Sequence, residues 1–352
     1  MIQDWLKQAV EAGTSDIFIG AGRQVTFKIN GVLVPQDSGI LMPNNSEELI
    51  TSLYELAHRP MSKYMDCGDD DFPITVPGLA RFRVNTYRQR STMAAIIRVV
   101  LFSIPNYKDL LIPDDVMRIA SENNGLALVT GPAGSGKSTT LACIIDAINK
   151  VRNCHIITLE DPIEYLHRDN KCLVSQREIS TDTDSYMDAL RASLRQAPDI
   201  ILLGEMRDHE TIRTAITAAE TGHLVISTLH TVGAANTIDR IIDIFPPEQQ
   251  QQTRVQLSMS LRMVVSQRLL PNVAGKSIPA FEIMRVNTAI SNLIRESKTH
   301  QIDNVIQTSA QDGMIGMDAF ILKLLRGGEV TAETALRNAS NPEQMQRIIE
   351  KS

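Results

Sequence analysis

The sequence predicts an α/β protein in which a domain built on a parallel sheet follows a small α+β domain and precedes a helical region. Four continuously apolar runs alternate with helical stretches between residues 125 and 230, which is typical of parallel strands covered by helices on both faces. Short apolar runs alternate with turn signals before that segment, and the chain turns polar with helical spacing after about Val286. We expect domains at residues 1–100, 114–287 and 288–352, with a linker at residues 101–113.

The first domain is predicted to combine two helices with a sheet. Helices are expected at Ile2–Ala12 and Ser46–His58, and the segment FKI-NG-VLV predicts a β-hairpin with a type I′ turn at Asn30-Gly31. Prolines in the segment LFSIPNYKDLLIP, at residues 105 and 113, discourage regular structure. That segment is therefore expected to link the first domain to the second.

The second domain is expected to hold the parallel sheet. Its four apolar runs are GLALVTG (125–131), HIITLED (155–161), DIILLGE (199–205) and HLVISTLH (223–230). A helix is predicted between the last two runs, with Asp208 as its N-cap and Gly222 as its C-terminal stop. Further helices are expected in the C-terminal segments TAISNLIRESK, GMDAFILKLLRGG and EQMQRIIEKS.

Composition excludes several classes of protein. The 352 residues include 35 Lys plus Arg and 41 Asp plus Glu, so the formal charge of −6 gives no basic footprint for nucleic acid. No run approaches the roughly 18 apolar residues that span a bilayer, and the N-terminus lacks the apolar core of a signal peptide. A cytoplasmic protein without a nucleic-acid partner is expected. The four cysteines form no CxxC pair, which favours reduced structural thiols over a zinc site or disulfides.

A phosphate-binding loop is predicted directly after the first apolar run. Residues 131–138 read GPAGSGKS, which satisfies GxxxxGK[ST] between a strand and the helical stretch TTLACIIDAINKV. Glycines let the backbone N–H groups face a polyphosphate, and the helix N-terminus adds its positive dipole. Lys137 is expected to reach the β- and γ-phosphates, and the Ser138 hydroxyl to bind Mg²⁺. The residues of this stretch expected to bind nucleotide are Gly131, Pro132, Ala133, Gly134, Ser135, Gly136, Lys137, Ser138 and Thr139.

Polar side chains end the other three apolar runs. Because the carboxyl ends of parallel strands share one edge of a sheet, Glu160-Asp161, Glu205 and His230 are expected to converge on the phosphate loop. ATP hydrolysis needs a held Mg²⁺, an oriented water and positive charge on the transferring phosphoryl group. Carboxylates can supply the first two, and the candidates are Glu160, Asp161, Glu164 and Glu205. We expect Glu160 to contact the nucleotide and Glu205 to share the Mg²⁺ with Ser138, partly through water.

Arginines in both domains can supply the positive charge. The segment RFRVNTYRQR (81–90) concentrates arginine with almost no acid beside it. Such a run is either a solvated strand face or a surface that meets a triphosphate across an interface, and both interpretations stay open. The candidates are Arg191, Arg195 and Arg207 in the second domain and Arg81, Arg83, Arg88, Arg90 and Arg98 in the first. The sequence has neither an LSGGQ stretch nor a guanine-specifying N-K-x-D pattern, so adenine is the expected base.

These residues resemble the secretion superfamily of hexameric ATPases, and within it the type IV pilus retraction ATPases. Four motifs carry the resemblance, namely GPAGSGKSTTLA (Walker A), ITLEDPIEYLH (Asp box), DIILLGEMRDHETI (atypical Walker B) and AAETGHLVISTLHT (His box). The resemblance implies a RecA-like P-loop domain behind a PAS-like N-terminal domain. It also implies a homohexameric Mg-ATP-hydrolysing motor at the inner face of the cytoplasmic membrane, which drives pilus retraction and twitching motility. The implied partners are an inner-membrane platform protein and a paralogous pilus ATPase.

The resemblance assigns roles to single residues. Glu205 resembles the Walker B glutamate and Glu164 the Asp box glutamate often assigned as general base, and the sequence does not separate the two. The arginines that match family positions near the γ-phosphate are Arg83 and Arg98 in the first domain and Arg191 and Arg207 in the second. His223 and His230 match the His box, but about 23 Å of strand would separate them. We therefore expect His230 to sense nucleotide and His223 to serve an interface.

The sequence also departs from the family pattern. Its four cysteines do not form the four-cysteine zinc insertion usual in extension and secretion members, and we expect no further N-terminal domain of the kind those members carry. TAISNLIRE resembles the AIRNLIRE box of retraction motors with Ser291 in place of arginine, and Ile17-Phe18 replaces the usual Leu-His. Alternatives that stay open are an accessory retraction ATPase, a nucleotide-gated partner of another motor, and the ATPase of a related type II secretion or DNA-uptake machine. A RecA-type nucleic-acid motor is disfavoured by the net charge.

Overall fold

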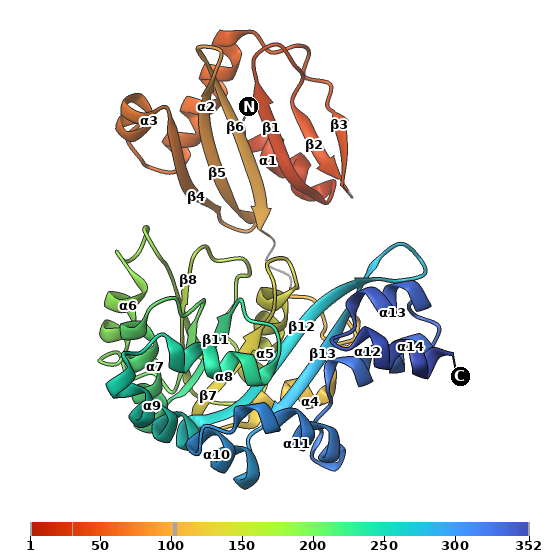
Figure 1. The fold of residues 1–352 in the computed structure, drawn as a ribbon. Helices are drawn as coiled ribbons and strands as arrows, with labels where there is room; N and C mark the ends of the chain where they lie inside the picture. The colour runs from red at the N-terminus through yellow and green to blue at the C-terminus, as the bar shows by residue number, and fades with distance from the viewer. Residues whose placement is uncertain (1, 30, 101–103, 351–352) are drawn as a thin grey trace. The chain divides into compact units, whose positions relative to one another are not determined.

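The chain divides into two compact units, shown in Figure 1. The computed structural model describes residues 2–29, 31–100 and 104–350. The first unit ends at residue 103 and also includes Glu164–Leu166, and the second unit comprises the rest. Residues 101–103 of the expected linker and Asn30 of the expected type I′ turn lie outside the described residues.

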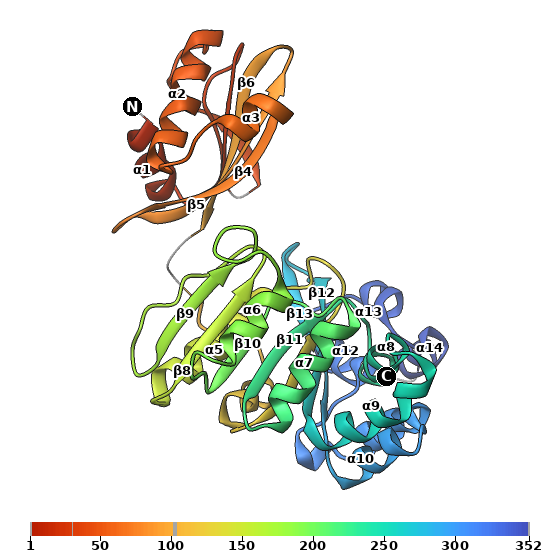
Figure 2. The ribbon, with the colours of Figure 1, turned by 90° about the vertical axis from the view of Figure 1, so that its left-hand side faces the viewer.

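The first unit is an antiparallel sheet with helices on one face (Figure 2). Its strand order is β3-β2-β1-β6-β5-β4. The strands are β1 Thr14–Gly20, β2 Thr26–Ile29, β3 Val32–Pro35, β4 Asp69–Val76, β5 Ala80–Gln89 and β6 Thr92–Val100, and the helices are α1 Ile2–Glu11, α2 Pro43–Leu56 and α3 Ser62–Cys67. The β2–β3 hairpin confirms the expected pairing, with Ile29 opposite Val32. Helix α2 begins three residues earlier than expected because Pro43 suits the first helical position, and α3 was not predicted.

Alternation along the central strands separates a core face from an open face. Phe82 and Val84 of β5 and Ile97 of β6 are buried in the core of this unit. Because successive side chains of a strand point to opposite faces, Arg83 and Arg98 lie on the open face. These two arginines are direct cross-strand partners. The pairing register therefore brings together two residues that are fifteen positions apart in the sequence.

The second unit is built on a seven-stranded sheet of order β13-β12-β7-β11-β10-β8-β9. Its strands are β7 Gly125–Thr130, β8 His155–Glu160, β9 Leu173–Glu178, β10 Ile200–Leu203, β11 Leu224–Leu229, β12 Leu261–Pro271 and β13 Ser277–Arg285. Strand β13 pairs antiparallel with β12, and the other neighbours are parallel. The four expected apolar runs form β7, β8, β10 and β11, as predicted. Strands β9, β12 and β13 were not predicted.

Helices cover both faces of this sheet, which explains its continuously apolar strands. Leu126 and Leu128 of β7 pack into a core formed with α6 to α11, whereas Ala127 and Val129 pack into a core formed with α4, α5 and α12 to α14. Figure 2 shows α6 and α7 against the sheet. The helices are α4 Asp114–Met117, α5 Lys137–Val151, α6 Tyr186–Ser193, α7 His209–Glu220, α8 Ala234–Asp243, α9 Pro247–Ser260, α10 Thr288–Arg295, α11 Ile302–Thr308, α12 Met317–Arg326, α13 Ala332–Asn338 and α14 Pro342–Ile349.

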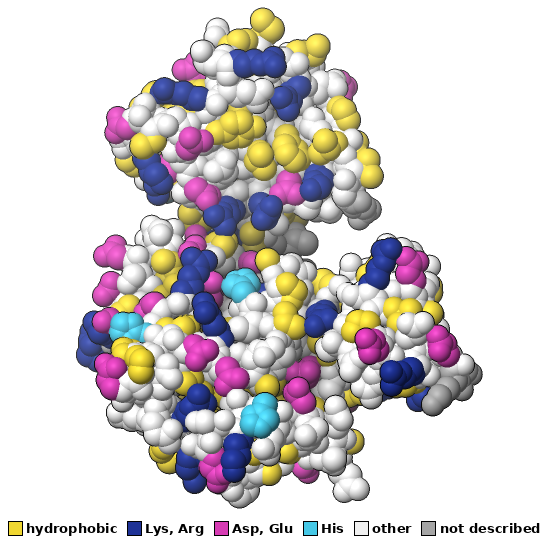
Figure 3. Space-filling model, viewed as in Figure 1, with side chains coloured by type: hydrophobic (Ala, Val, Ile, Leu, Met, Phe, Trp, Pro, Cys, Tyr) yellow, Lys and Arg dark blue, Asp and Glu magenta, His cyan; other side chains and the backbone are white. Residues whose placement is uncertain are grey.

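Local signals fix both ends of α7 as expected. The Asp208 side chain accepts a hydrogen bond from the Thr211 N–H and caps α7, and Gly222 after the helix adopts a φ of +111°. Within the described residues, no helix is both long and apolar enough to cross a membrane. Basic and acidic side chains are interspersed over the face shown in Figure 3.

Candidate nucleotide-binding site

The phosphate loop joins the buried end of β7 to the start of α5. Gly136 is the N-cap of α5, with a φ of +85°, and Lys137 is its first residue. Gly131 has a φ of +140°, and a Cβ there would overlap the carbonyl oxygen of Gln267 and lie 2.9 Å from the Ser135 hydroxyl oxygen. A side chain is therefore excluded at Gly131 both by its backbone conformation and by the neighbouring strand β12.

Polar groups inside this loop fit an anionic ligand. Lys137 is 9% exposed, and its ammonium donates to the carbonyl oxygens of Gly131 and Pro132 at 2.9 and 3.0 Å. The Ser135 hydroxyl is buried and has no hydrogen-bond partner in the described part of the chain. A buried hydroxyl without a partner is costly unless a ligand satisfies it. An ammonium, a free hydroxyl and a helix N-terminus together form the donor set that a polyphosphate requires.

A charged cluster follows β10 and β11 on the same edge of the sheet. Glu205 has a side chain only 12% exposed, and one of its oxygens lies 2.6 Å from the Arg207 guanidinium. Its other oxygen lies 3.6 Å from Nε2 of His230. The hydrogen bond that the Arg207 guanidinium donates to Glu205 raises the pKa of Arg207. The structure thus brings Glu205, Arg207 and His230 together. Contacts with the other two residues fix the position of the Glu205 carboxylate.

The Asp box begins at the end of β8. Glu160 accepts hydrogen bonds from the Thr158 hydroxyl at 2.7 Å and from the Gln176 amide at 3.1 Å, so its position is fixed by β8 and β9. Asp161 and Glu164 are exposed in the loop that follows. The structure therefore fixes Glu160 at the sheet edge and leaves Glu164 on an exposed loop.

Tyr186 is a site residue that the sequence analysis missed. It is the first residue of α6, and a Cβ placed on Gly204 would lie 2.7 Å from its hydroxyl. Burial raises the pKa of Tyr186, and the nearby carboxylates of Glu205, Asp161 and Glu160 raise it further. The hydroxyl is thus kept protonated among the acidic residues of the site. No motif marks this tyrosine, because only the fold brings α6 against the end of β10.

Three other predicted residues lie away from this cluster or at its margin. His223 precedes β11, at the opposite end of that strand from His230, and its Nδ1 lies 3.0 Å from the Ala218 carbonyl oxygen. Arg191 on α6 lies 3.8 Å from Glu210 on α7, and Arg195 is exposed after α6. The strand separates the two histidines, as expected from their spacing.

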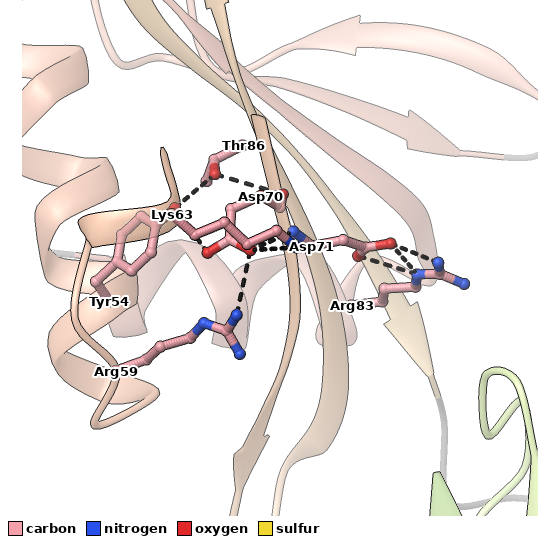
Figure 4. Close-up of polar contacts among 7 residues, drawn as sticks. All are labelled: Tyr54, Arg59, Lys63, Asp70, Asp71, Arg83 and Thr86. Atoms are coloured by element: carbon pink, nitrogen blue, oxygen red, sulfur yellow. Dashed lines mark hydrogen bonds and ion pairs between the residues drawn. The ribbon is translucent and has the colours of Figure 1, made fainter. Parts of the chain in front are cut away.

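The two candidate arginines of the first unit are paired with carboxylates of their own sheet. Figure 4 shows the guanidinium of Arg83 against the carboxylate of Asp71, with an N–O distance of 2.5 Å. Arg98 lies 3.1 Å from Asp16, whose side chain is 11% exposed. Lys28 lies 4.0 Å from the same Asp16. A row of charged side chains thus crosses the open face from β2 to β4, with the neighbouring Arg83 and Arg98 each paired to a carboxylate on its outer side.

Two further arginines of the segment 81–90, Arg88 and Arg90, lie in different environments. Arg88 donates to the Met65 carbonyl oxygen at 3.0 Å and lies over the Tyr64 ring, 5.4 Å from its centroid. Arg90 lies in the β5–β6 turn with a φ of +51°. Arg88 is therefore held by contacts within the first unit.

Comparisons with known proteins agree with this geometry. The model of the Type II/IV secretion system protein family matches residues 1–348. The chain belongs to this family. It is 42% identical to the type IV pilus retraction ATPase PilT of Pseudomonas aeruginosa over 97% of this chain and 99% of that protein. It is 37% identical to the type IV pilus ATPase PilU of the same organism, over 98% of this chain and 90% of that protein.

A solved member of the family has the same fold. The crystal structure of the pilus retraction motor PilT with bound ADP superposes with a TM-score of 0.90 at 44% identity, covering 98% of both chains. This secretion-family chain is accordingly an ATPase with a RecA-like domain, and it uses a nucleotide.

Proposed function

We propose that this secretion-family ATPase hydrolyses Mg-ATP as a homohexameric motor that drives type IV pilus retraction. The observation that carries the proposal is the phosphate loop, with its buried ammonium and free hydroxyl, on the same sheet edge as the cluster of Glu205, Arg207 and His230. The near full-length similarity to PilT supports retraction as the task. We place the motor at the inner face of the cytoplasmic membrane, acting on a platform protein of that membrane.

The loop residues bind the nucleotide in this proposal. Residues 131–136 direct N–H groups to the phosphates, and Lys137 exchanges its two carbonyl partners for phosphate oxygens. Ser138 and Glu205 hold Mg²⁺, which supplies charge neutralisation at the phosphates when bound. Ser138 and Thr139 lie in the first turn of α5, directly after the loop.

Two carboxylates share the task of handling the attacking water. Glu205 is nearly buried and is oriented by Arg207, whereas Glu164 is exposed on a loop. We assign the fixed position beside the phosphates to Glu205 and the general-base role to Glu164. His230 reports the nucleotide through its contact with Glu205. His223, at the other end of β11, serves an interface, and Arg191 contributes charge from α6.

Arginines of the first unit act across subunits of the hexamer. Arg83 is paired with Asp71, and Arg98 with Asp16. Each arginine can therefore reach a phosphate only by exchanging its carboxylate for that phosphate. Because both arginines are partly exposed, that exchange costs little. Adding positive charge at the transferring phosphoryl group then accelerates hydrolysis. Closure around ATP and release after hydrolysis would be the mechanical stroke.

A second candidate function is an accessory retraction ATPase or nucleotide-gated partner. Two observations support this function. The chain is 37% identical to PilU, and Ser291 on α10 stands in place of the arginine of the retraction box. The ATPase of a type II secretion or DNA-uptake machine is less favoured, because the similarity to PilT covers nearly all of both chains.

Steady-state ATP turnover with size-exclusion light scattering on the same samples tests the proposal. Wild-type hexamers should hydrolyse ATP, Glu205→Gln should abolish hydrolysis, and Glu220→Gln on the exposed end of α7 should behave as wild type. The wild-type gene should then restore pilus retraction to a strain lacking its retraction ATPase. Hexamers that bind ATP but do not hydrolyse it would favour the accessory function. Absence of ATP binding would refute both.

A further inference from the structure

Gln267 is a buried polar residue in the middle of β12, beside the phosphate loop. It is 3% exposed, and it belongs to a strand that the sequence analysis did not predict. Strand β12 runs parallel to β7, and Ser266 is paired with Thr130, the residue immediately before the loop. The register of the two strands thus sets Gln267 level with Gly131.

Three groups of Gln267 lie against the phosphate loop and the helix that follows it. Its carbonyl oxygen faces Gly131, at the position a Cβ would occupy. Its side-chain Nε2 would lie 2.9 Å from a Cβ on Gly136. Its Oε1 accepts a hydrogen bond of 2.7 Å from the Thr140 hydroxyl in the first turn of α5. One residue therefore touches the beginning of the loop, its end and the helix that follows.

The side chain of Gln267 suits this place for a physical reason. Both the Thr140 hydroxyl and the Gln267 amide are buried, so each needs the hydrogen bond that joins them. Removing one partner leaves the other buried and unsatisfied, which costs far more than replacing both with apolar groups of the same shape. The bond holds the amide against Gly136, where the chain passes from the loop into the helix.

We propose that Gln267 is the positioning residue of the phosphate loop, which it holds in its binding shape through Gly136 and Thr140. The inference rests on the proposed phosphate-binding role of this loop. Gln267 itself touches no nucleotide, and it acts only through the loop. The loop holds the phosphates both in the bound substrate and in the transition state. Its displacement therefore weakens nucleotide binding more than it lowers the rate at which bound nucleotide is hydrolysed.

Three variants and two readouts test the proposal. Gln267→Met and Thr140→Val each remove one partner of the bond, and the double variant replaces both with apolar side chains. The dissociation constant of a fluorescent N-methylanthraniloyl ADP and the KM and kcat for ATP are measured, together with the melting temperature. Each single variant should raise the ADP dissociation constant and the KM about tenfold, the effect of one unsatisfied buried group. The double variant should bind ADP more tightly than it would if the two single losses of affinity simply multiplied.

Two controls separate positioning from general stability. Thr140→Ser keeps the hydroxyl and should bind ADP within about twofold of wild type, since its hydrogen bond is retained. Gln256→Met makes the same chemical change on α9, where the amide donates to Glu220 on the surface, and should leave ADP binding and KM unchanged. If Gln267→Met does not fold, the nearly isosteric Thr140→Val still reports on the same bond.

Two results would overturn the proposal. One is an unchanged ADP dissociation constant and KM in both single variants, with only the melting temperature lowered. The other is a double variant in which the two losses of affinity simply multiply. ADP binding by the wild type does not depend on pilus retraction or on hydrolysis. A wild type that binds ADP without hydrolysing ATP would therefore contradict the proposed motor and still test Gln267.

Discussion

Two glycines of the phosphate loop offer a matched pair of substitutions with different expected costs. Gly134 has a φ of +75° and open space around its α-carbon, so Gly134→Ala introduces only backbone strain of about 1–2 kcal/mol. Gly131→Ala adds strain of about 1–3 kcal/mol at a φ of +140°. It also forces an overlap with the Gln267 carbonyl that costs about 1–3 kcal/mol. The total for Gly131→Ala is about 2–6 kcal/mol.

Urea unfolding of both variants measures the difference in free energy. The single tryptophan of the chain, Trp5, lies on α1 of the first unit, so its fluorescence follows that unit and far-UV circular dichroism follows the whole chain. Gly131→Ala should lower the midpoint of the circular dichroism transition much more than Gly134→Ala, because a Cβ on Gly131 would meet β12 and a Cβ on Gly134 would not. The Trp5 transition should stay at its wild-type midpoint in both variants.

Binding of the fluorescent ADP distinguishes loop displacement from loss of stability alone. Gly131→Ala should lose ADP affinity, because either the loop or β12 must move to relieve the overlap. Equal losses of stability in the two variants would refute the reasoning, since strain would then be the whole effect. Wild-type ADP affinity in Gly131→Ala would also contradict it.

Three further substitutions have distinct expected outcomes. Lys137→Ala should abolish ATP turnover in a steady-state phosphate-release assay, because it removes the ammonium at the start of α5. Arg83→Ala should lower kcat about 100-fold with unchanged ADP affinity. Its control, Arg88→Ala, loses contacts to Met65 and Tyr64, so it should lower the melting temperature and leave kcat unchanged. Burial raises the pKa of Glu282 above the ordinary 4.5, so the folded chain binds that proton more tightly than the unfolded chain. The free energy of unfolding should therefore fall as the pH rises above about 4.5, and urea titrations of Glu282→Gln should lack this component.

The parallel core of the second unit could be predicted because its signals are local. Strands buried on both faces are continuously apolar, and the polar residue that ends each run marks the ligand-binding edge of the sheet. The candidates Glu205 and His230 follow from that pattern, and the phosphate loop follows from its own motif directly after the first run. The structure brings two of these residues together, with an oxygen of Glu205 3.6 Å from Nε2 of His230.

Contacts that depend on strand register could not be predicted from the sequence. Arg98 is paired with Asp16, which is 82 positions away, because β1 and β6 are neighbours in the sheet. The short edge strand β9 has a mixed polar and apolar sequence. Strands β12 and β13 flank a turn that Asn272 and Gly275 mark in the sequence, so this hairpin is a feature that the sequence analysis missed. Tyr186 likewise enters the site only because α6 packs against the end of β10.

Residues of strand β12 contact loops whose motifs lie far away in the sequence. Ser266 accepts a hydrogen bond from the Gly233 N–H in the loop after His230, while Gln267 on the opposite face contacts the phosphate loop. The next residue, Arg268, donates to the Asn338 carbonyl oxygen at the end of α13. Three consecutive residues thus tie together the phosphate loop, the His box loop and the C-terminal helices. Strand β12 therefore contacts both loops of the sheet edge and, through Arg268, the end of α13 in the C-terminal region.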